Sequence, residues 1–436
     1  MISLLYNQAQ PVVQLSKVLA PAFFNVHNYI KNGIYSDYYL KGGRGSCKSS
    51  TPSIEIVNGM MADPLANAMC IMKVGTSIET GVFNQIQWAI DILQVTQYWK
   101  SNKNNHSFTY LPTGQRIYCR GCDDPSKFKS VKLVSGYFKY QWFEELDAFD
   151  GIAEIRKVQQ SLTRAGLKRA IRFYSYNPPQ TVDHWVNRFI IDLQSNIAKG
   201  IVKNTLVHHS TYLTVPKEWL GEQFIEDAEQ LKKTNPRAYE HEYLGEITGT
   251  GGQVFANVKA LNMTQEIIDT FGYVYRGLDW GFAVDPTASH GVYYDRNKKD
   301  LYIFDEIYEY GISYDQLANL IRQHNPNNML IRADSAEPRS NSELVSRGLN
   351  VTGVKKGPGS VDHGIKWLQS LNNIFIDQVK CPNAYREFVG YEYEQTKDGN
   401  FKSSYPDKNN HAIDDVRYAL EDIIQSNGVG RINIKR

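Results

Sequence analysis

Residues 42–49 read Gly42-Gly43-Arg44-Gly45-Ser46-Cys47-Lys48-Ser49, and this stretch decides the fold class of the N-terminal half. It follows the spacing G-x-x-x-x-G-K-[ST], in which backbone N–H groups cradle phosphates, the lysine reaches the terminal phosphates and the hydroxyl binds Mg²⁺. A short strand-like run precedes the stretch and a helix is expected from Ser49 onward, which suits the pattern, although Cys47 stands where the pattern has glycine. An exposed turn of small residues is the alternative. We predict an ATP-binding loop formed by Gly43, Arg44, Gly45, Ser46, Cys47, Lys48, Ser49 and Ser50.

A pair of acids at the end of a later strand complements this loop. The strand-like run Tyr140-Gln141-Trp142-Phe143 leads directly into Glu144 and Glu145, about 95 residues after Lys48. Glu144 is expected to hold Mg²⁺, directly or through water. Glu145 is expected to orient and deprotonate the attacking water. A solvated acidic helix cap is the alternative interpretation of both residues.

Two other residues are candidates for sensing the γ-phosphate. Arg44 lies inside the loop and could act as an arginine finger, with a salt bridge on the loop exterior as the alternative. Ser175 ends the apolar run 171–174 and is followed closely by Pro178 and Pro179. A polar residue at such a strand tip could respond to the nucleotide, or it could belong to a structural turn.

The order of strand-like and helix-like segments predicts an α/β protein. Up to about Gly245, short β-like runs such as 68–74 alternate with helical patterns such as 82–93. This alternation favours a parallel sheet covered by helices. Three glycines within 248–252 mark a flexible joint, after which a second α/β pattern follows and ends in a helix expected over 411–425.

Composition excludes several classes of protein. Of the 436 residues, 42% are hydrophobic, which is enough for packed cores, and the net charge of +2 argues against histone-like nucleic-acid binding while leaving room for a local basic groove. No run approaches 18 apolar residues and the N-terminal residues lack a charged and apolar leader, so we expect neither a membrane span nor a secretory signal. The odd count of five cysteines indicates a reducing compartment rather than a disulfide scaffold. Cys119 and Cys122 have zinc-like spacing without a second pair, so buried thiols are the better interpretation.

The C-terminal half carries a second group of candidate residues. Asp279 and Asp334 each follow an apolar strand-like run, and His411 and Asp414 share one face of the expected last helix. Acids at strand ends together with an acid and a histidine at a helix start can converge on divalent cations, and oxygen-rich sites suit Mg²⁺ or Mn²⁺. Two such ions would support phosphodiester hydrolysis. Each acid could instead be a cap or a solvated side chain, and Asp415 competes with Asp414 for the position near His411.

A basic loop lies between these acids in the sequence. Lys355 and Lys356 sit in the glycine-rich segment 353–360, which is of the right type to hold DNA backbone phosphates. A solvated surface loop is the alternative.

Taken in order, these motifs resemble the large terminase subunits of tailed phages, in the branch named after the PBSX prophage. The phosphate loop, the Trp142-Phe143-Glu144-Glu145 run and Ser175–Pro179 resemble the ATPase half of that family, and 239–245 resembles its linker region. The segments 277–281, 334–338 and 410–414 resemble its nuclease half. The resemblance runs from about Leu15 to Leu420.

The resemblance implies a DNA-packaging motor with two enzymatic domains. Residues 1–247 would form a P-loop ATPase domain with a mainly parallel sheet, including a linker subdomain from about 205, and 248–252 would be the joint. Residues 253–436 would form an RNase H-like nuclease domain with a mixed sheet. ATP hydrolysis would drive double-stranded DNA into a procapsid, and the nuclease would cut the concatemeric genome.

The resemblance also implies roles, cofactors and partners. Lys48, Ser49 and Glu144 would bind ATP with Mg²⁺, with Glu145 as the catalytic carboxylate and Arg44 as the candidate finger. Two Mg²⁺ or Mn²⁺ ions would be carried by Asp279, Asp334, His411 and Asp414. Partners would be double-stranded DNA, the portal ring and the small terminase subunit, with no membrane. The protein would act in the host bacterial cytoplasm as an oligomer on the procapsid portal vertex, be absent from the mature virion, and could be monomeric in solution.

Three other classes of protein stay open from the residues alone. A P-loop helicase or ATPase with an inert second domain would hydrolyse ATP without cutting DNA. An RNase H-like transposase or integrase with a fused ATPase would join strands as well as cleave them. A scaffold protein of the capsid vertex would need neither Lys48 and Glu145 nor the four metal candidates.

Overall fold

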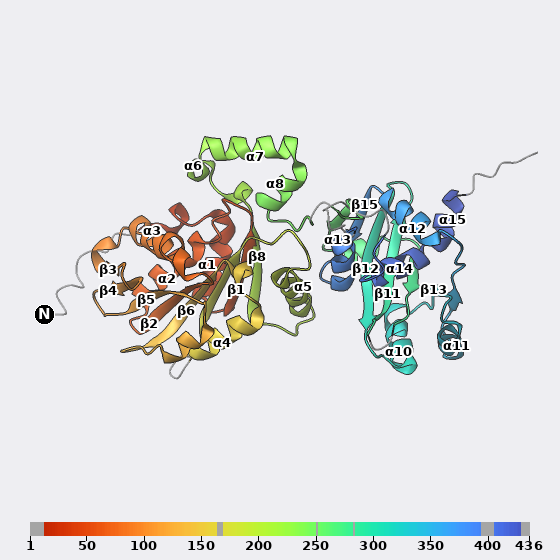
Figure 1. Cartoon of the computed structure of the whole chain (residues 1–436), viewed down its shortest axis with the longest axis horizontal. Helices are drawn as coiled ribbons and strands as arrows, with labels where there is room; N and C mark the ends of the chain where they lie inside the picture. Colours follow the sequence, from red (N-terminus) through yellow and green to blue (C-terminus); the bar gives the residue numbers. More distant parts are fainter. Residues whose placement is uncertain (1–12, 164–168, 250–251, 282–283, 394–404, 429–436) are drawn as a thin grey trace, which may run out of the picture. The chain divides into compact units, whose positions relative to one another are not determined.

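The computed structural model describes residues 13–163, 169–249, 252–281, 284–393 and 405–428, which fold as two compact units (Figure 1). The first unit comprises Met1–Gln180 with His184–Thr248, and the second comprises Thr181–Asp183 with Gly249–Arg436. The units therefore separate at Thr248 and Gly249, inside the glycine-rich segment. In the described part of the chain, no helix is both long and apolar enough to cross a membrane.

The first unit is built on an eight-stranded, mainly parallel sheet. Its strand order is β3-β4-β5-β2-β6-β7-β1-β8. Pairing is parallel from β5 to β8 across the sheet, and only the edge strands β3 and β4 pair antiparallel. The strands are β1 (Asp37–Gly42), β2 (Ala66–Met72), β3 (Trp99–Asn102), β4 (Ser107–Tyr110), β5 (Arg116–Gly121), β6 (Tyr137–Glu144), β7 (Ile171–Tyr176) and β8 (Thr205–Ser210).

Helices cover both faces of this sheet because its central strands are apolar on both sides. In β1, Tyr38 and Leu40 pack into one hydrophobic core and Tyr39 packs into the other, as the two-residue period of a strand requires. One core takes in α1 (Phe24–Lys31), α2 (Ser50–Ala62) and α3 (Asn84–Ile92). The opposite core takes in α4 (Ile152–Leu162) and α5 (Trp185–Ala198). The helix expected over 82–93 is shorter, because a π-turn at Glu79–Phe83 precedes α3.

Three helices lie apart from those that cover the sheet, at one end of the strands (Figure 1). They are α6 (Lys217–Leu220), α7 (Glu222–Thr234) and α8 (Pro236–Glu242). The expected linker subdomain began at about 205, but residues 205–210 form β8, which pairs in parallel with β1 as an edge strand of the sheet. The helical segment therefore begins at Lys217, after the last strand is in place.

The second unit contains a seven-stranded mixed sheet with the order β14-β13-β10-β11-β12-β15-β9. The pairs β10–β11 and β11–β12 are antiparallel, and the outer pairs are parallel. The strands are β9 (Val258–Ala260), β10 (Val274–Leu278), β11 (Thr287–Asp295), β12 (Asp300–Glu309), β13 (Ile331–Ala333), β14 (Val351–Gly353) and β15 (Asn373–Ile376). The predicted fold class, an α/β protein with a mainly parallel sheet and a mixed sheet, is confirmed.

The helices of the second unit pack on this sheet, and one of them packs directly on its central strands. They are α9 (Gln265–Ile268), α10 (Tyr314–His324), α11 (Pro338–Ser346), α12 (Ser360–Gln369), α13 (Pro382–Gly390), α14 (His411–Ala419) and α15 (Glu421–Gly428). A β-carbon on Gly277 of β10 would lie 1.7 Å from the carbonyl oxygen of Asp415 in α14, so this glycine permits the close approach. The single helix expected over 411–425 is two helices, because the backbone at Leu420 is not helical (φ −100°, ψ 11°), and the bend keeps Ile423 and Ile424 buried.

Candidate functional sites

The phosphate loop connects the end of β1 to the start of α2. Gly45 and Cys47 both have positive φ, +71° and +61°, in the left-handed region where glycine is favoured over other residues. The conformation at Cys47 therefore explains why the pattern has glycine there. The Lys48 ammonium donates a hydrogen bond to the carbonyl oxygen of Gly43 at 3.1 Å. Burial lowers the pKa of Lys48, against the opposing effect of Glu144 and Asp147.

The end of β6 meets this loop through a chain of hydrogen bonds. The Ser49 hydroxyl donates to Glu144 Oε1 at 2.6 Å, and the Ser175 hydroxyl donates to the other carboxylate oxygen. Ser175 in turn accepts a hydrogen bond from Trp142 Nε1 at 2.6 Å, which fixes the orientation of its hydroxyl. Burial raises the pKa of Glu144, and the two hydroxyl donors oppose that shift. The two residues that sequence reasoning assigns to Mg²⁺, Ser49 and Glu144, thus lie in contact.

Two further acids, Glu145 and Asp147, directly follow β6. Glu145 begins a turn with φ +54°. Its residue surface is largely open to solvent, but the neighbouring protein partly desolvates the carboxyl group, and this desolvation together with the charge of Asp147 raises its pKa. Asp147 was not among the predicted site residues. Burial raises the pKa of Asp147 and the charge of Lys48 lowers it, so the two side chains interact electrostatically. Three acids within 144–147 were the sequence signal for this residue.

The segment after α8 closes on the phosphate loop from outside. The Arg44 backbone N–H donates to the carbonyl oxygen of Glu242 at 2.8 Å, and Arg44 Nη1 lies 4.0 Å from the Glu242 carboxylate. A β-carbon on Gly43 would lie 2.0 Å from the carbonyl oxygen of Tyr243, so only glycine fits under this segment. The Arg44 side chain is 66% exposed and occupies the exterior ion pair that the sequence left open as an alternative.

The register of the second sheet places two of the predicted acids side by side. Leu278 of β10 pairs with Ala333 of β13, so the residues that follow them, Asp279 and Asp334, leave neighbouring parallel strands at the same edge. The Asp334 backbone N–H donates to the carbonyl oxygen of Leu278 at 3.0 Å, which holds the two ends together. Burial raises the pKa of Asp279, and the nearby charges of Asp414 and Asp334 raise it further.

The first turn of α14 brings the remaining two predicted residues to this edge. His411 Nδ1 lies 3.0 Å from Asp279 Oδ2, and this hydrogen bond raises the pKa of His411 despite burial. Asp414 is partly exposed and Asp415 is fully buried. Asp415 Oδ2 accepts a hydrogen bond from His290 Nδ1 at 2.6 Å, on the core side of the helix. Of the two competing acids, the structure therefore places Asp414 and not Asp415 with the other predicted metal ligands.

Each of the three site carboxylates has a cationic or histidine partner in this structure. Lys356 Nζ lies 2.6 Å from Asp334 Oδ1, and Arg417 Nη2 donates to Asp414 Oδ1 at 2.7 Å. Over the described residues, no three or more His, Cys, Asp or Glu side chains lie close enough together to hold a metal ion in this arrangement. The donor set of three carboxylates and one imidazole nevertheless suits Mg²⁺ or Mn²⁺ in its chemistry, because it is rich in oxygen.

A buried layer beneath this edge was missed by sequence reasoning. His290 is fully buried between two acids, since its Nε2 lies 3.1 Å from Glu306 and its Nδ1 lies 2.6 Å from Asp415. Glu387 accepts a hydrogen bond from the backbone N–H of Ala412, and burial raises its pKa to about 7. The residues of this layer come from segments far apart in the sequence, so no local motif indicates them.

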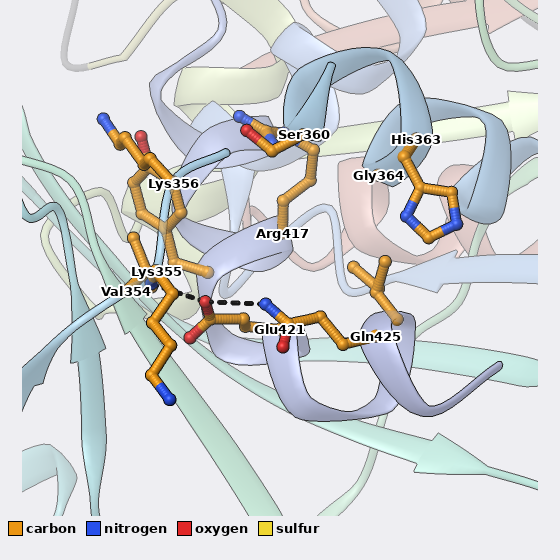
Figure 2. A pocket seen from close by; sticks show the side chains of 11 residues that line it. Val354, Lys355, Lys356, Ser360, His363, Gly364, Arg417, Glu421 and Gln425 are labelled. Atoms are coloured by element: carbon orange, nitrogen blue, oxygen red, sulfur yellow. Dashed lines mark hydrogen bonds between the residues drawn. The ribbon is translucent and has the colours of Figure 1, made fainter. Parts of the chain in front are cut away.

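The basic loop borders a hollow beside the same edge (Figure 2). Lys355 and Lys356 line it together with residues of α12, α14 and α15, including Ser360, His363 and Arg417. The Lys355 backbone N–H donates to Glu421 Oε1 at 2.6 Å, which ties the loop to α15. Figure 2 shows the two lysine side chains leaving the loop in different directions.

A parallel sheet with a phosphate loop, followed by a mixed sheet with acids at its strand ends, defines a class: a P-loop ATPase joined to an RNase H-like nuclease. The family model described as phage terminase large subunit matches residues 37–246, and the one described as terminase RNAseH like domain matches 279–422. The large terminase subunit of Bacillus phage SPP1 is 38% identical over 424 residues, covering 96% of this chain and 98% of that protein. The chain belongs to the phage terminase large subunits, and it is an enzyme of phage DNA packaging with an ATPase and a nuclease domain.

Further matches are to terminases as well. The PBSX phage terminase large subunit of Bacillus subtilis (strain 168) is 27% identical, with coverage of 91% of this chain and 92% of that one. The solved nuclease domain of the SPP1 large terminase with bound Mn is 36% identical, covers 39% of this chain and 98% of that one, and gives a TM-score of 0.37. The solved large terminase of bacteriophage HK97 is 11% identical, with coverage of 95% of each chain and a TM-score of 0.40.

Proposed function

We propose that this subunit couples ATP hydrolysis in its first unit to translocation of double-stranded DNA into a procapsid, and cuts the concatemeric genome with a two-metal nuclease in its second unit. One observation carries the proposal: each unit gathers its predicted acids at one edge of its own sheet. Parallel strands end at a common edge, and ligands of α/β sheets bind there. We assign residues 1–247 to the motor, 248–252 to the joint and 253–436 to the nuclease.

In the motor, the residues around the phosphate loop divide the work of phosphoryl transfer. Mg²⁺ bound with ATP neutralises the charge of the β- and γ-phosphates. Ser49 and Glu144 would hold it, since they already share a hydrogen bond of 2.6 Å. Lys48 would leave the Gly43 carbonyl oxygen for the terminal phosphates, and the raised pKa of Glu145 suits a base that accepts a proton from water. Arg44 would act as the finger only after it leaves Glu242.

In the nuclease, four side chains would hold two divalent cations. Such a pair of ions activates water and stabilises the leaving oxygen in phosphodiester hydrolysis. Asp279, Asp334 and Asp414 supply hard oxygen donors, and His411 is oriented by its hydrogen bond to Asp279. Both Mg²⁺ and Mn²⁺ suit this set.

Lys355 and Lys356 are proposed as contacts to DNA phosphates. They border the hollow beside the acids, so a duplex whose scissile phosphate lies at the acids would pass within reach of this loop. We further propose the portal ring and the small terminase subunit as partners, and an oligomer on the procapsid portal vertex in the host cytoplasm as the working state.

The test uses the full chain and two matched pairs of variants. Asp279→Asn should reduce Mn²⁺-dependent cutting of supercoiled plasmid by at least about 100-fold, while the exposed control Asp362→Asn should cut like the unmodified chain. Glu145→Gln should reduce ATP hydrolysis by about 100-fold or more, while Glu226→Gln, exposed on α7, should not. ATP hydrolysis without any metal-dependent cutting would move the assignment to a P-loop ATPase with an inert second unit. Strand joining would favour a transposase.

A further inference from the structure

Cations of the chain itself compensate the acids of the nuclease edge. Lys356 Nζ lies 2.6 Å from Asp334 Oδ1, and Arg417 Nη2 lies 2.7 Å from Asp414 Oδ1. A divalent cation needs carboxylate oxygens of the same kind as ligands. Each of these cations shares a carboxylate with the metal that we propose to bind there, so a bound metal repels both cations and competes with them for the same group. The structure distinguishes between the two ion pairs.

The surroundings of Arg417 hold its side chain next to Asp414. Its side chain is only 6% exposed, it belongs to the same helix as Asp414, and it donates to Asp414 Oδ1 from both Nε and Nη2. Its Cδ would lie 2.9 Å from a β-carbon on Gly364, so α12 packs closely over it. Arg417 therefore has less room to leave its partner than a solvent-exposed side chain has.

The surroundings of Lys356 allow its side chain to leave Asp334. Its side chain is 41% exposed, and it lies in the loop between β14 and α12, which contains Gly357 and Gly359, whereas Asp334 follows β13. Its ammonium also lies 5.2 Å from the centre of the Tyr418 ring, a contact that can hold a cation after the carboxylate is lost. Because the ammonium lies partly in solvent, it can leave without crossing a packed core, and a divalent ion would replace the positive charge that the largely buried carboxylate of Asp334 loses.

We propose that Lys356 is an exchangeable cation that couples metal binding to DNA binding at the nuclease site. A divalent ion at Asp334 displaces the Lys356 ammonium, and the released ammonium then binds a phosphate of the DNA backbone. The inference rests on the proposed nuclease function and adds an order of binding to it. The loop makes its full set of contacts with DNA only when the metal site is occupied. Lys356 acts as a positioning residue in this scheme.

The neighbouring lysine provides a matched control. Among the described residues, the Lys355 ammonium has no ion-pair partner, and only the backbone of Lys355 is tied down, by Glu421. Lys355→Met and Lys356→Met thus remove the same charge from the same loop, but only the second removes a competitor from Asp334.

The first measurement is metal affinity in the absence of DNA. Mn²⁺ binding to the full chain is followed by the loss of the free-ion EPR signal, with Asp334→Asn as the blank for binding elsewhere. Lys356→Met should bind Mn²⁺ about two- to fivefold more tightly than the unmodified chain, because a weak ion pair no longer competes. Lys355→Met should bind like the unmodified chain.

The second measurement is the salt dependence of duplex affinity with and without Ca²⁺, which fills oxygen sites; gels verify that the duplex stays intact. Each additional phosphate contact steepens the slope of log K against log salt by about 0.9. For the unmodified chain and for Lys355→Met, adding Ca²⁺ should steepen this slope by that amount. Before Ca²⁺ is added, the slope of Lys355→Met should be shallower than that of the unmodified chain. For Lys356→Met, the change in slope on adding Ca²⁺ should be smaller by about 0.9 than for the other two proteins.

The outcomes separate this inference from the function on which it rests. If Lys356→Met and Lys355→Met have equal Mn²⁺ affinities and equal changes in slope while the unmodified chain cuts DNA, the exchange is wrong and the nuclease assignment stands. If the unmodified chain neither cuts nor binds DNA with metal, the proposed function itself fails.

Discussion

Asp414 and Asp415 are adjacent acids with opposite environments, and exchanging each for asparagine should separate catalysis from stability. Asp414 is partly exposed at the sheet edge, whereas Asp415 is fully buried against His290. We expect Asp414→Asn to abolish metal-dependent cutting with little loss of stability. Asp415→Asn should unfold the second unit at a distinctly lower temperature.

The magnitudes follow from burial. Removing one partner of a buried ion pair costs about 3–5 kcal/mol, and Asp415 is 0% exposed with His290 at 2.6 Å. In a unit of this size, 1 kcal/mol corresponds to about 2–4 °C, so Asp415→Asn should lower the melting temperature by at least about 6 °C. Stability does not need the charge of Asp414, because the amide oxygen of an asparagine at this position can still accept from Arg417. A loss below about 1 kcal/mol is therefore expected for Asp414→Asn.

The pH dependence of the same pair provides an independent check. Burial alone would lower the pKa of His290, but Asp415 and Glu306 outweigh it and raise the pKa to about 10. Because the pKa of His290 is higher in the folded state than in the unfolded state, its protonation stabilises the fold. This stabilisation is complete below about pH 6.5 and is lost as the pH rises through about 10. The destabilisation caused by Asp415→Asn should therefore be larger at pH 6 than at pH 9.

Calorimetry of the full chain measures these changes, and plasmid cutting with Mn²⁺ measures the catalytic arm. Asp362→Asn, an exposed acid on α12, is the control for loss of one negative charge. Equal melting temperatures for the Asp415→Asn chain and the unmodified chain would refute the argument from burial. An equal fall in melting temperature for Asp414→Asn would refute the assignment of catalysis to Asp414 and of stability to Asp415.

Three other substitutions test the contacts described above. Lys48→Ala should abolish ATP hydrolysis and leave metal-dependent cutting by the full chain intact; retained hydrolysis would remove the assignment of the phosphate loop. Gly277→Ala should force α14 off β10 at a cost of about 1–3 kcal/mol or more and impair cutting, whereas Gly272→Ala, whose β-carbon would meet only Tyr293 at 3.7 Å, should melt like the unmodified chain. Cys47→Gly should keep or raise the melting temperature of the first unit. A residue other than glycine in the left-handed region costs about 1–2 kcal/mol, and the greater chain entropy of glycine in the unfolded state offsets about half of the gain from removing this strain. A marked fall in melting temperature would contradict the strain at this position.

The parts of the fold that sequence could predict are those fixed by local patterns. The phosphate loop needs small residues, a lysine and a hydroxyl at set spacing, so its position between β1 and α2 follows from residues 42–49 alone. Asp279 and Asp334 follow from the same logic, because each ends an apolar run. The predicted family, fold class and enzyme class are confirmed on this basis, while the individual site residues stay predictions.

The parts that sequence could not predict depend on contacts between distant segments. The face of α14 that meets the core is set by its close approach to Gly277, which turns Asp415 inward and leaves Asp414 at the edge. The buried partner of Asp415 is His290, 125 residues away. The apolar residues Ile413 and Val416 indicate which side of α14 faces the core, but they do not show that Asp415 and Arg417 are buried as well.

The two lysines that we propose to bind phosphates, Lys48 and Lys356, rest on different acceptors, and the difference has consequences for how each would be released. Lys48 rests on the carbonyl oxygen of Gly43, a neutral acceptor, and burial lowers its pKa and so already disfavours its charge. In the proposed motor, an incoming triphosphate would offer full negative charge, so the lysine would transfer to it without a second cation taking its place at the carbonyl oxygen. Lys356 rests on the carboxylate of Asp334, and leaving it would expose an uncompensated negative charge beside Asp279. In the proposed scheme its release therefore requires a replacement cation, so the phosphate loop would respond to the nucleotide and the nuclease loop would respond to metal and DNA together.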